Sequence, residues 1–215
     1  MSNSTKIRIL LADDHTMFRD GLKQVLSRAT DFTIAGEAGD AQEVIEKVDH
    51  TEPDVVILDI AMPGRDGIDV LKQLKQTKPK LHILILSMYP EDQYAFRAIK
   101  AGASGYLTKN KAAQELIEAI RQIASGRRYI SPDVAEQLAI DIEKDAAYPL
   151  HQRLSDREYQ VMRLIASGKT VTHIADELSL SVSSISTLRS RILAKMDMKS
   201  NAEITHYAIK HKLVE

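Results

Sequence analysis

The chain has 215 residues, of which 44% are hydrophobic and none is cysteine, so it is long enough for two domains with buried cores and cannot form disulfides or thiolate metal sites. No apolar run is long enough for a signal peptide or a membrane span, which predicts a soluble, cytoplasmic protein without a membrane partner. The net charge of −1 hides a basic excess, because residues 151–215 carry 10 Lys and Arg against 7 Asp and Glu, and this excess permits a polyanionic partner there.

Residues 6–125 alternate short apolar runs with helical patterns. The runs, which suit strands buried on both faces of a sheet, are IRILLA (7–12), FTIAG (32–36), DVVIL (54–58), HILIL (82–86) and SGYL (104–107). The helical patterns cover 17–29, 40–48, 67–76, 91–102 and 112–126. Asp40 and Glu43 are expected to form a capping box, and Gly102 and Gly126 to stop helices. This alternation predicts an α/β fold, a doubly wound five-stranded parallel sheet in the order 2-1-3-4-5.

Residues 126–149 are acidic and read as a linker with one possible helix from about 132 to 144. Residues 150–214 then read as an all-α domain of four helices. Capping boxes are expected at Ser155 with Glu158 and at Ser200 with Glu203, and a tight turn at 179–181 separates two helices. This pattern predicts a second, smaller domain that contains a helix-turn-helix.

Carboxylates follow two strands that the expected order makes neighbours. Asp13 and Asp14 follow the run 7–12, and Asp59 follows the run 54–58. Ligands of such open sheets bind past the carboxyl ends of the strands, where the strand order reverses. An Asp at a strand end is common, but three at neighbouring strands need a cation to balance their charge, and Mg²⁺ with oxygen ligands suits them.

Two further groups, Ser87 and Lys109, are expected at the same edge. A hydroxyl and an ammonium can satisfy phosphoryl oxygens, so Asp59 would be a phosphoryl acceptor that forms an aspartyl phosphate, with the Met-Pro-Gly turn at 62–64 moving the backbone aside. A phosphohydrolase of the haloacid dehalogenase type also uses an Asp nucleophile and Mg²⁺. Such an enzyme needs a second acid two residues later, where this chain has Ala61.

Residues 6–125 resemble the receiver domain of bacterial two-component response regulators, through ADDH (12–15), LDIAMPGRDG (58–67), LSM (86–88) and AGASGYLTK (101–109). The resemblance implies that Asp59 is phosphorylated by a sensor histidine kinase. It implies Mg²⁺ ligands at Asp13, Asp14, Asp59 and the carbonyl of Ala61, a switch pair in Ser87 and Tyr106, and a phosphoryl-binding ammonium in Lys109. Without the resemblance, Tyr106 would be interpreted as a core aromatic residue.

In the helix-turn-helix, packing should bury one face, formed by Ile174, Ala175, Leu178, Leu180, Ile185, Leu188 and Ile192. The opposite face of the second helix presents Ser183, Ser186, Thr187, Ser190, Arg191 and Lys195. Hydroxyls and cations on one face suit base edges and phosphates of double-stranded DNA. A helical bundle with a solvated polar face is the alternative interpretation, and it predicts a regulator that acts through protein partners alone.

Residues 150–213 resemble the LuxR-type DNA-binding domain. The resemblance implies that the third helix, roughly 182–196, reads DNA and that the fourth, roughly 200–211, supplies a homodimer contact through the stripe Ile204, Tyr207, Ala208 and His211. Short hydroxyls stand where relatives often carry longer side chains, so phosphate contacts by Lys169, Arg189, Arg191 or Lys195 are expected to add affinity.

Together the two resemblances place the chain with response regulators of the NarL/FixJ type, and RYISPDVAEQL (128–138) is similar to a stretch of the branch that includes GacA and UvrY. They imply a phosphorylation-gated transcription factor that dimerises on activation. It would not be an enzyme, apart from self-catalysed phosphotransfer and dephosphorylation.

Overall fold

The computed structural model describes residues 6–62, 66–111, 113–143 and 149–214. Its contacts divide the chain into two compact units, Met1–Ile142 and Glu143–Glu215, and each unit is described by itself. The boundary falls inside the expected linker. Among the described residues, no helix is both long and apolar enough to cross a membrane.

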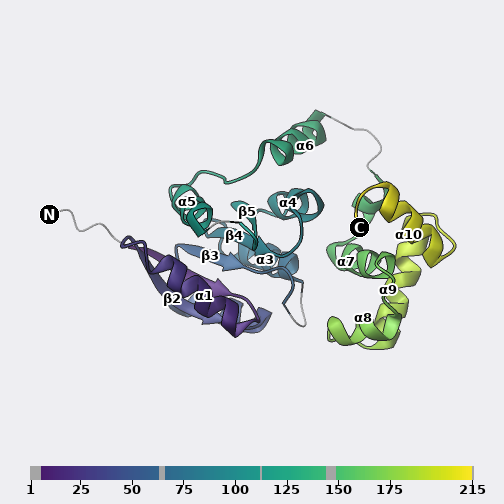
Figure 1. Ribbon diagram of the computed structural model, residues 1–215, viewed down its shortest axis with the longest axis horizontal. Coiled ribbons are helices and arrows are strands. Elements are labelled where there is room, and N and C mark those ends of the chain that lie inside the picture. Colours follow the sequence, from purple (N-terminus) through teal and green to yellow (C-terminus); the bar gives the residue numbers. More distant parts are fainter. Residues whose placement is uncertain (1–5, 63–65, 112, 144–148, 215) are drawn as a thin grey trace. The chain divides into compact units, whose positions relative to one another are not determined.

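The first unit alternates strands and helices (Figure 1). Its strands are β1 Ile7–Ala12, β2 Phe32–Ala38, β3 Val55–Leu58, β4 His82–Ser87 and β5 Gly105–Thr108. Its helices are α1 Thr16–Leu26, α2 Ala41–Thr51, α3 Gly67–Thr77, α4 Glu91–Lys100, α5 Ala113–Ala124 and α6 Pro132–Glu143. All strand pairs are parallel and the order is β2-β1-β3-β4-β5, so the expected doubly wound sheet is confirmed.

Alternate residues of the strands bury apolar side chains on both faces of the sheet. On one face, Ile9, Ile57 and Leu84 pack against α1 and α5, which contribute residues such as Leu26 and Ile120. Helix α2 contacts β1 and β2, α4 contacts β5, and α3 lies between α2 and α4. Because the strands are covered on both sides, their carboxyl ends form the accessible edge of the sheet.

The helix boundaries test the predicted caps. Helices α4 and α5 end just before Gly102 and Gly126, which adopt positive φ angles of 106° and 84°, as expected of helix stops. Asp40 caps α2, but the carboxylate of Glu43 accepts from the amide of Gly39 and not from that of Asp40, so the capping box predicted there is wrong in its second half. The reciprocal bond is made one residue earlier.

The chain beyond α5 returns to the edge of the sheet. The amide of Tyr129 donates to the carbonyl of Ser104 at 2.9 Å, and the amide of Tyr106 donates to the carbonyl of Tyr129 at 3.3 Å. Gly105 permits this approach, because a Cβ atom there would lie 2.9 Å from the Tyr129 carbonyl oxygen. The expected linker helix follows as α6, and position 144 lies outside the described residues.

The second unit is all-helical. After the 3-10 turn Leu150–Arg153 it contains α7 Asp156–Ala166, α8 Val171–Glu177, α9 Val182–Lys195 and α10 Asn201–Lys210. Helix α7 contacts the other three helices. The capping box of Ser155 and Glu158 is confirmed. The carboxylate of Glu203 accepts from the amide of Lys199 and from the hydroxyl of Ser200, but not from the amide of Ser200, so the box at Ser200 forms only in part.

Candidate functional sites

The acidic residues meet at the carboxyl edge of the sheet because their strands are neighbours. Ala12 and Leu58 are partners in the register of β1 and β3, so Asp13 and Asp59, one residue further, emerge side by side. The amide of Asp59 donates to the carbonyl of Ala12 at 2.9 Å, which extends the ladder to Asp59 itself. Asp13 and Asp59 are both buried. The strand order therefore places the acidic side chains as the sequence predicts.

Lys109 is the counter-charge of this cluster. It follows β5, and its Nζ lies 2.5 Å from Asp13 Oδ2 and 2.6 Å from Asp59 Oδ2. Its side chain is only 6% exposed. Two nearly buried carboxylates thus share one buried ammonium, which favours the charged form of all three groups.

Burial and charge oppose each other at Asp59. Burial raises the pKa of this carboxyl group, and the attraction of the Lys109 ammonium reduces the rise without cancelling it. For Lys109, burial lowers the pKa, but the charges of Asp59 and Asp13 outweigh burial and the net pKa is raised. Asp59 is therefore a carboxylate that water solvates poorly, and a further cation would stabilise its charge.

Asp14 is the least satisfied member of the cluster. Its Oδ1 is buried and accepts no hydrogen bond from the described residues, although His15 Nδ1 lies 2.8 Å away. Ligand atoms of Asp13, Asp14 and His15 all lie within 4.8 Å of one another. A carboxylate oxygen without a donor, beside others already bound to Lys109, fits a hard cation with oxygen ligands. His15 directly follows the Asp pair in the sequence, but no role was predicted for it.

Ser87 and Tyr106 are linked through one residue of the loop after β4. Ser87 is buried, and its Oγ accepts from the amide of Tyr89 at 3.2 Å. Tyr106 is also buried, and its hydroxyl donates to the carbonyl of Tyr89 at 2.8 Å. Both members of the expected switch pair thus hold the same main-chain segment, whose Tyr89 ring stacks on Tyr94. Both side chains therefore help to hold this loop.

Ala61 follows Asp59 closely and is exposed. Its amide donates to Asp59 Oδ1 at 3.1 Å, which fixes the carboxylate that the sequence assigns as acceptor. Most of the turn expected at 62–64 lies outside the described residues.

The helix-turn-helix consists of α8 and α9 around a turn in which Ser179 has a positive φ of 51°. Five of the residues expected inside are buried, namely Ile174, Ala175, Leu178, Ile185 and Ile192. The prediction of full burial is wrong for Leu180 and Leu188, which are half-buried. Leu180 follows the exposed turn residue, and Leu188 lies at the margin of the contact face of α9, where solvent reaches both.

The opposite face of α9 is exposed and hydroxyl-rich, as the sequence predicts. Its hydroxyls bond within the helix: Ser186 donates to the carbonyl of Val182, Thr187 to that of Ser183, and Ser190 to that of Ser186, at 2.9, 2.9 and 3.0 Å. Each hydroxyl oxygen keeps its lone pairs toward solvent. This face can therefore accept hydrogen bonds and can offer small apolar groups.

The expected DNA-binding cations differ in their partners. Lys169 pairs with Glu177 at 2.5 Å, and Arg189 donates to Asn201 at 2.6 Å. Lys195 donates to the buried carboxylate of Glu158 at 2.6 Å. Burial raises the pKa of Glu158, but the hydrogen bonds from Lys195 and Ser155 and the charge of Lys195 together outweigh burial, so the net pKa is lowered.

Lys195 thus stabilises α7 against α9. Arg191 is exposed and has no partner among the described residues of the unit. Of the four cations, Arg191 is the most available for a phosphate.

The stripe on α10 that was expected to form a dimer contact is only partly accessible. Ile204 and Ala208 are buried within the unit, where α10 packs on α7, so they cannot contact a second chain, and this part of the prediction is wrong. The hydroxyl of Tyr207 lies 2.9 Å from His151 Nδ1, and its ring packs against that of His211 at a tilt of 30°, with centroids 4.2 Å apart. The exposed residues of α10 are Asn201, Ala202, Glu203, His206, Ile209 and Lys210.

Each of the two units matches a known protein family. Residues 9–121 match the family model of the response regulator receiver domain, and residues 152–208 match that of bacterial regulatory proteins of the luxR family. The chain belongs to the response regulators. Its receiver and LuxR-type domains make it a DNA-binding transcription regulator, as the sequence motifs imply.

Similar proteins match this response regulator over nearly its whole length. It is 34% identical to the response regulator UvrY of Escherichia coli over 96% of this chain and 95% of that protein. It is 33% identical to the response regulator GacA of Pseudomonas aeruginosa over 97% and 98%. The RcsB response regulator of Salmonella typhimurium is similar in structure, with a TM-score of 0.67, 26% identity, and coverage of 94% of this chain and 96% of that one.

Proposed function

We propose that a sensor histidine kinase phosphorylates Asp59 and that the phosphoryl group controls DNA binding by the second unit. The observation that carries the proposal is the buried meeting of Asp59, Asp13 and Lys109 at the carboxyl edge of the sheet, with a single ammonium for two carboxylates. A phosphoryl group on Asp59 would place its oxygens within reach of Lys109 and the buried hydroxyl of Ser87. Such charge-assisted bonds stabilise the product and bias the elements that supply them.

The same edge fits Mg²⁺. Asp13, Asp14, Asp59 and the carbonyl of Ala61 would hold the ion, and the buried Asp14 oxygen without a donor supports this assignment. When bound, Mg²⁺ supplies positive charge that neutralises the acceptor and the phosphoryl oxygens. Lys109 then orients Asp59 Oδ2, and the amide of Ala61 orients Oδ1, so that the carboxylate is fixed for in-line attack.

The change at Asp59 would reach the loop after β4. Ser87 holds the amide of Tyr89 and Tyr106 holds its carbonyl, so a Ser87 hydroxyl drawn toward a phosphoryl oxygen would release a bond that helps to fix this loop. The active form would then dimerise and read two half-sites about one helical turn apart, through α9. The RcsB regulator, which is 26% identical, has been solved as a complex with DNA.

The proposal predicts one Mg²⁺-dependent phosphoryl adduct. Intact-mass measurement with acetyl phosphate should show a single adduct on the wild type and none on Asp59→Asn, with tighter DNA binding only in the modified protein. Asp54→Asn is the matched control, because Asp54 also flanks β3 but lies at its other end, and this variant should accept the phosphoryl group normally. An adduct that persists in Asp59→Asn would move the acceptor elsewhere. Turnover of a generic phosphate ester would instead indicate a phosphohydrolase.

Arg191→Ala should weaken DNA binding about tenfold, because an exposed guanidinium with no partner in the described part of the chain is free to contact a phosphate. The slope of log affinity against log salt concentration should fall by about 1. Mobility-shift titrations at several salt concentrations measure both quantities. Arg28→Ala removes the same charge from the exposed surface of the first unit and should change affinity less than about twofold. Unchanged affinity in Arg191→Ala would remove Arg191 from the interface.

A further inference from the structure

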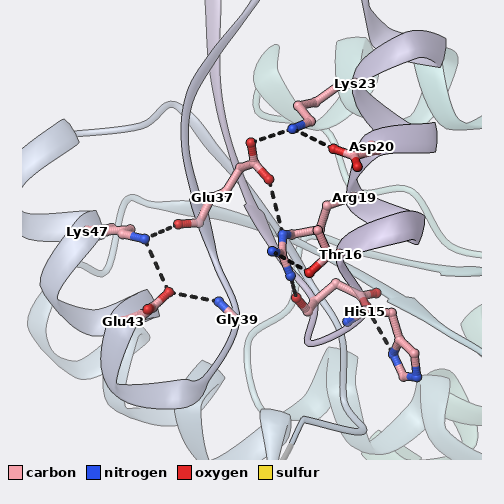
Figure 2. A network of polar contacts seen from close by, with 10 residues as sticks. His15, Thr16, Arg19, Asp20, Lys23, Glu37, Gly39, Glu43 and Lys47 are labelled. Atoms are coloured by element: carbon pink, nitrogen blue, oxygen red, sulfur yellow. Dashed lines mark hydrogen bonds and ion pairs between the residues drawn. The ribbon is translucent and has the colours of Figure 1, made fainter.

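A network of polar contacts joins the acidic edge to β2 and α1 (Figure 2). Glu37, near the end of β2, accepts from Arg19 Nε at 3.1 Å and from Lys23 Nζ at 2.7 Å, so two cations of α1 share its carboxylate. Arg19 also donates to the carbonyl of Asp13 at 2.5 Å and to the hydroxyl of Thr16 at 3.3 Å. The Arg19 guanidinium thus connects the end of β2, the start of α1 and the Asp13–Asp14 segment, which is called the acidic corner below.

The Asp13 carbonyl is the part of the corner that Arg19 fixes. The amide of Asp13 donates to the carbonyl of Ala38 at 3.0 Å, and its Oδ1 accepts from the amide of His15 at 2.9 Å. The peptide group between Asp13 and Asp14 is held on its carbonyl side by the hydrogen bond from Arg19. A net change in the backbone angles on either side of this peptide would redirect the Asp14 side chain, so the guanidinium helps to fix the direction in which Asp14 points.

Glu37 is itself held in place by α2. Lys47 donates to the main-chain carbonyl of Glu37 and pairs with Glu43 at 3.2 Å, while Glu43 accepts from the amide of Gly39 at 2.9 Å. Figure 2 shows Glu37 lying between the Lys47 side of the network and the Arg19 side. Contacts from α2 therefore hold the end of the strand that carries the anchor of Arg19.

We infer that Arg19, held by Glu37, is a positioning residue for the cation ligands Asp13 and Asp14. The inference rests on the proposed function, since it concerns the same Mg²⁺ site. In this role Arg19 would not need to touch the cation or the phosphoryl group. It acts through the Asp13 carbonyl, in the way that residues behind metal ligands hold those ligands in a binding geometry.

Charge alone predicts the opposite effect. A guanidinium near a divalent cation repels it, so removal of Arg19 would tighten cation binding if the residue acted only through its charge. A positioning role predicts weaker binding. Lys23 provides the matched control, because it binds the same carboxylate of Glu37 at 2.7 Å with the same charge, and its contacts do not include the Asp13–Asp14 corner.

The test is titration of the full chain with Mn²⁺, which accepts the same oxygen ligands, with free Mn²⁺ followed by electron paramagnetic resonance. Arg19→Met should raise the dissociation constant at least tenfold, the usual effect of losing a residue behind a metal ligand. Lys23→Met should leave the constant unchanged or lower it. Arg19→Lys keeps the charge but not the forked geometry, and it should bind as weakly as Arg19→Met.

Urea unfolding checks that each variant is folded under the titration conditions. If Arg19→Met is not folded, Arg19→Lys is used for the test. Equal or tighter Mn²⁺ binding in folded Arg19→Lys would overturn the inference. Equal weakening in Lys23→Met would also overturn it, because the loss would then follow from Glu37 alone. A wild-type protein that binds no Mn²⁺ or Mg²⁺ would contradict the proposed cation site itself, which separates the two failures.

Discussion

Replacing Lys109 with methionine is expected to lower the free energy of unfolding by about 3 to 5 kcal/mol, the usual loss when one partner of a buried ion pair is removed. The ammonium contacts Asp13 and Asp59 at 2.5 and 2.6 Å, and both carboxylates are almost completely buried. Without it they face each other with no cation. The loss therefore comes from the charges that remain and not from the missing methylene packing.

This origin gives the loss a defined pH dependence. Burial raises the folded-state pKa of Asp59 above its unfolded value even with Lys109 present. The ionised carboxylate therefore costs stability above the unfolded-state pKa, and its protonation removes that cost as pH falls through the folded-state pKa. The stability deficit of Lys109→Met should be largest near neutral pH and should shrink on acidification.

Urea unfolding followed by circular dichroism, without divalent cations, measures the difference at several pH values. Lys111→Met is the matched control, because Lys111 pairs with Glu115 at 3.2 Å on the surface. Exposed pairs of this kind contribute about 0 to 1 kcal/mol, so the control should lose little stability. Equal losses in the two variants, or a deficit of Lys109→Met that does not change with pH, would contradict the charge-balance role of Lys109.

Gly67→Ala is expected to cost about 3 kcal/mol of stability and to slow phosphorylation of Asp59 about a hundredfold. A Cβ atom at Gly67 would lie 2.4 Å from the carbonyl oxygen of Asp59 and 2.6 Å from the Cα atom of Ile60. Both obstacles are main-chain atoms and cannot rotate away. The chain must therefore shift at the strand end that carries the acceptor.

Gly21→Ala shows what the same change does where space is free. Gly21 lies inside α1, and a Cβ atom there would meet nothing within 4 Å. Alanine favours the helix over glycine by about 0.5 to 1 kcal/mol, so this variant should be more stable than the wild type. Thermal unfolding and adduct formation with acetyl phosphate, measured on both variants, test the pair. A Gly67→Ala protein with unchanged stability and an unchanged phosphorylation rate would show that the chain after β3 can shift without an energetic penalty.

The parts of the site that could be predicted from the sequence are those fixed by strand order. Asp13 and Asp59 end adjacent parallel strands, and Lys109 follows β5, so placing the sheet also places them. Helix stops at Gly102 and Gly126 follow from local backbone preference in the same way. Such features can be predicted from local sequence patterns and the order of the strands, and both can be read from the sequence.

The Arg19–Glu37 contact could not be predicted by the same reasoning. It joins residues 18 positions apart on α1 and β2, and many surface arginines and glutamates offer the same charges without meeting. Ile204 and Ala208 illustrate a second difficulty. An apolar stripe on a helix shows that something covers it, and in α10 the cover is α7 of the same unit and not a second chain.

The return of Tyr129 to β5 has a consequence for solubility. In the sheet order β5 is an outer strand, and an outer strand normally presents unpaired amides and carbonyls on which another chain can build. The bonds of Tyr129 with Ser104 and Tyr106 occupy this edge from within the same chain. The segment before α6 therefore protects β5 against edge-to-edge aggregation, and cleavage between α5 and Tyr129 would expose a template for self-association.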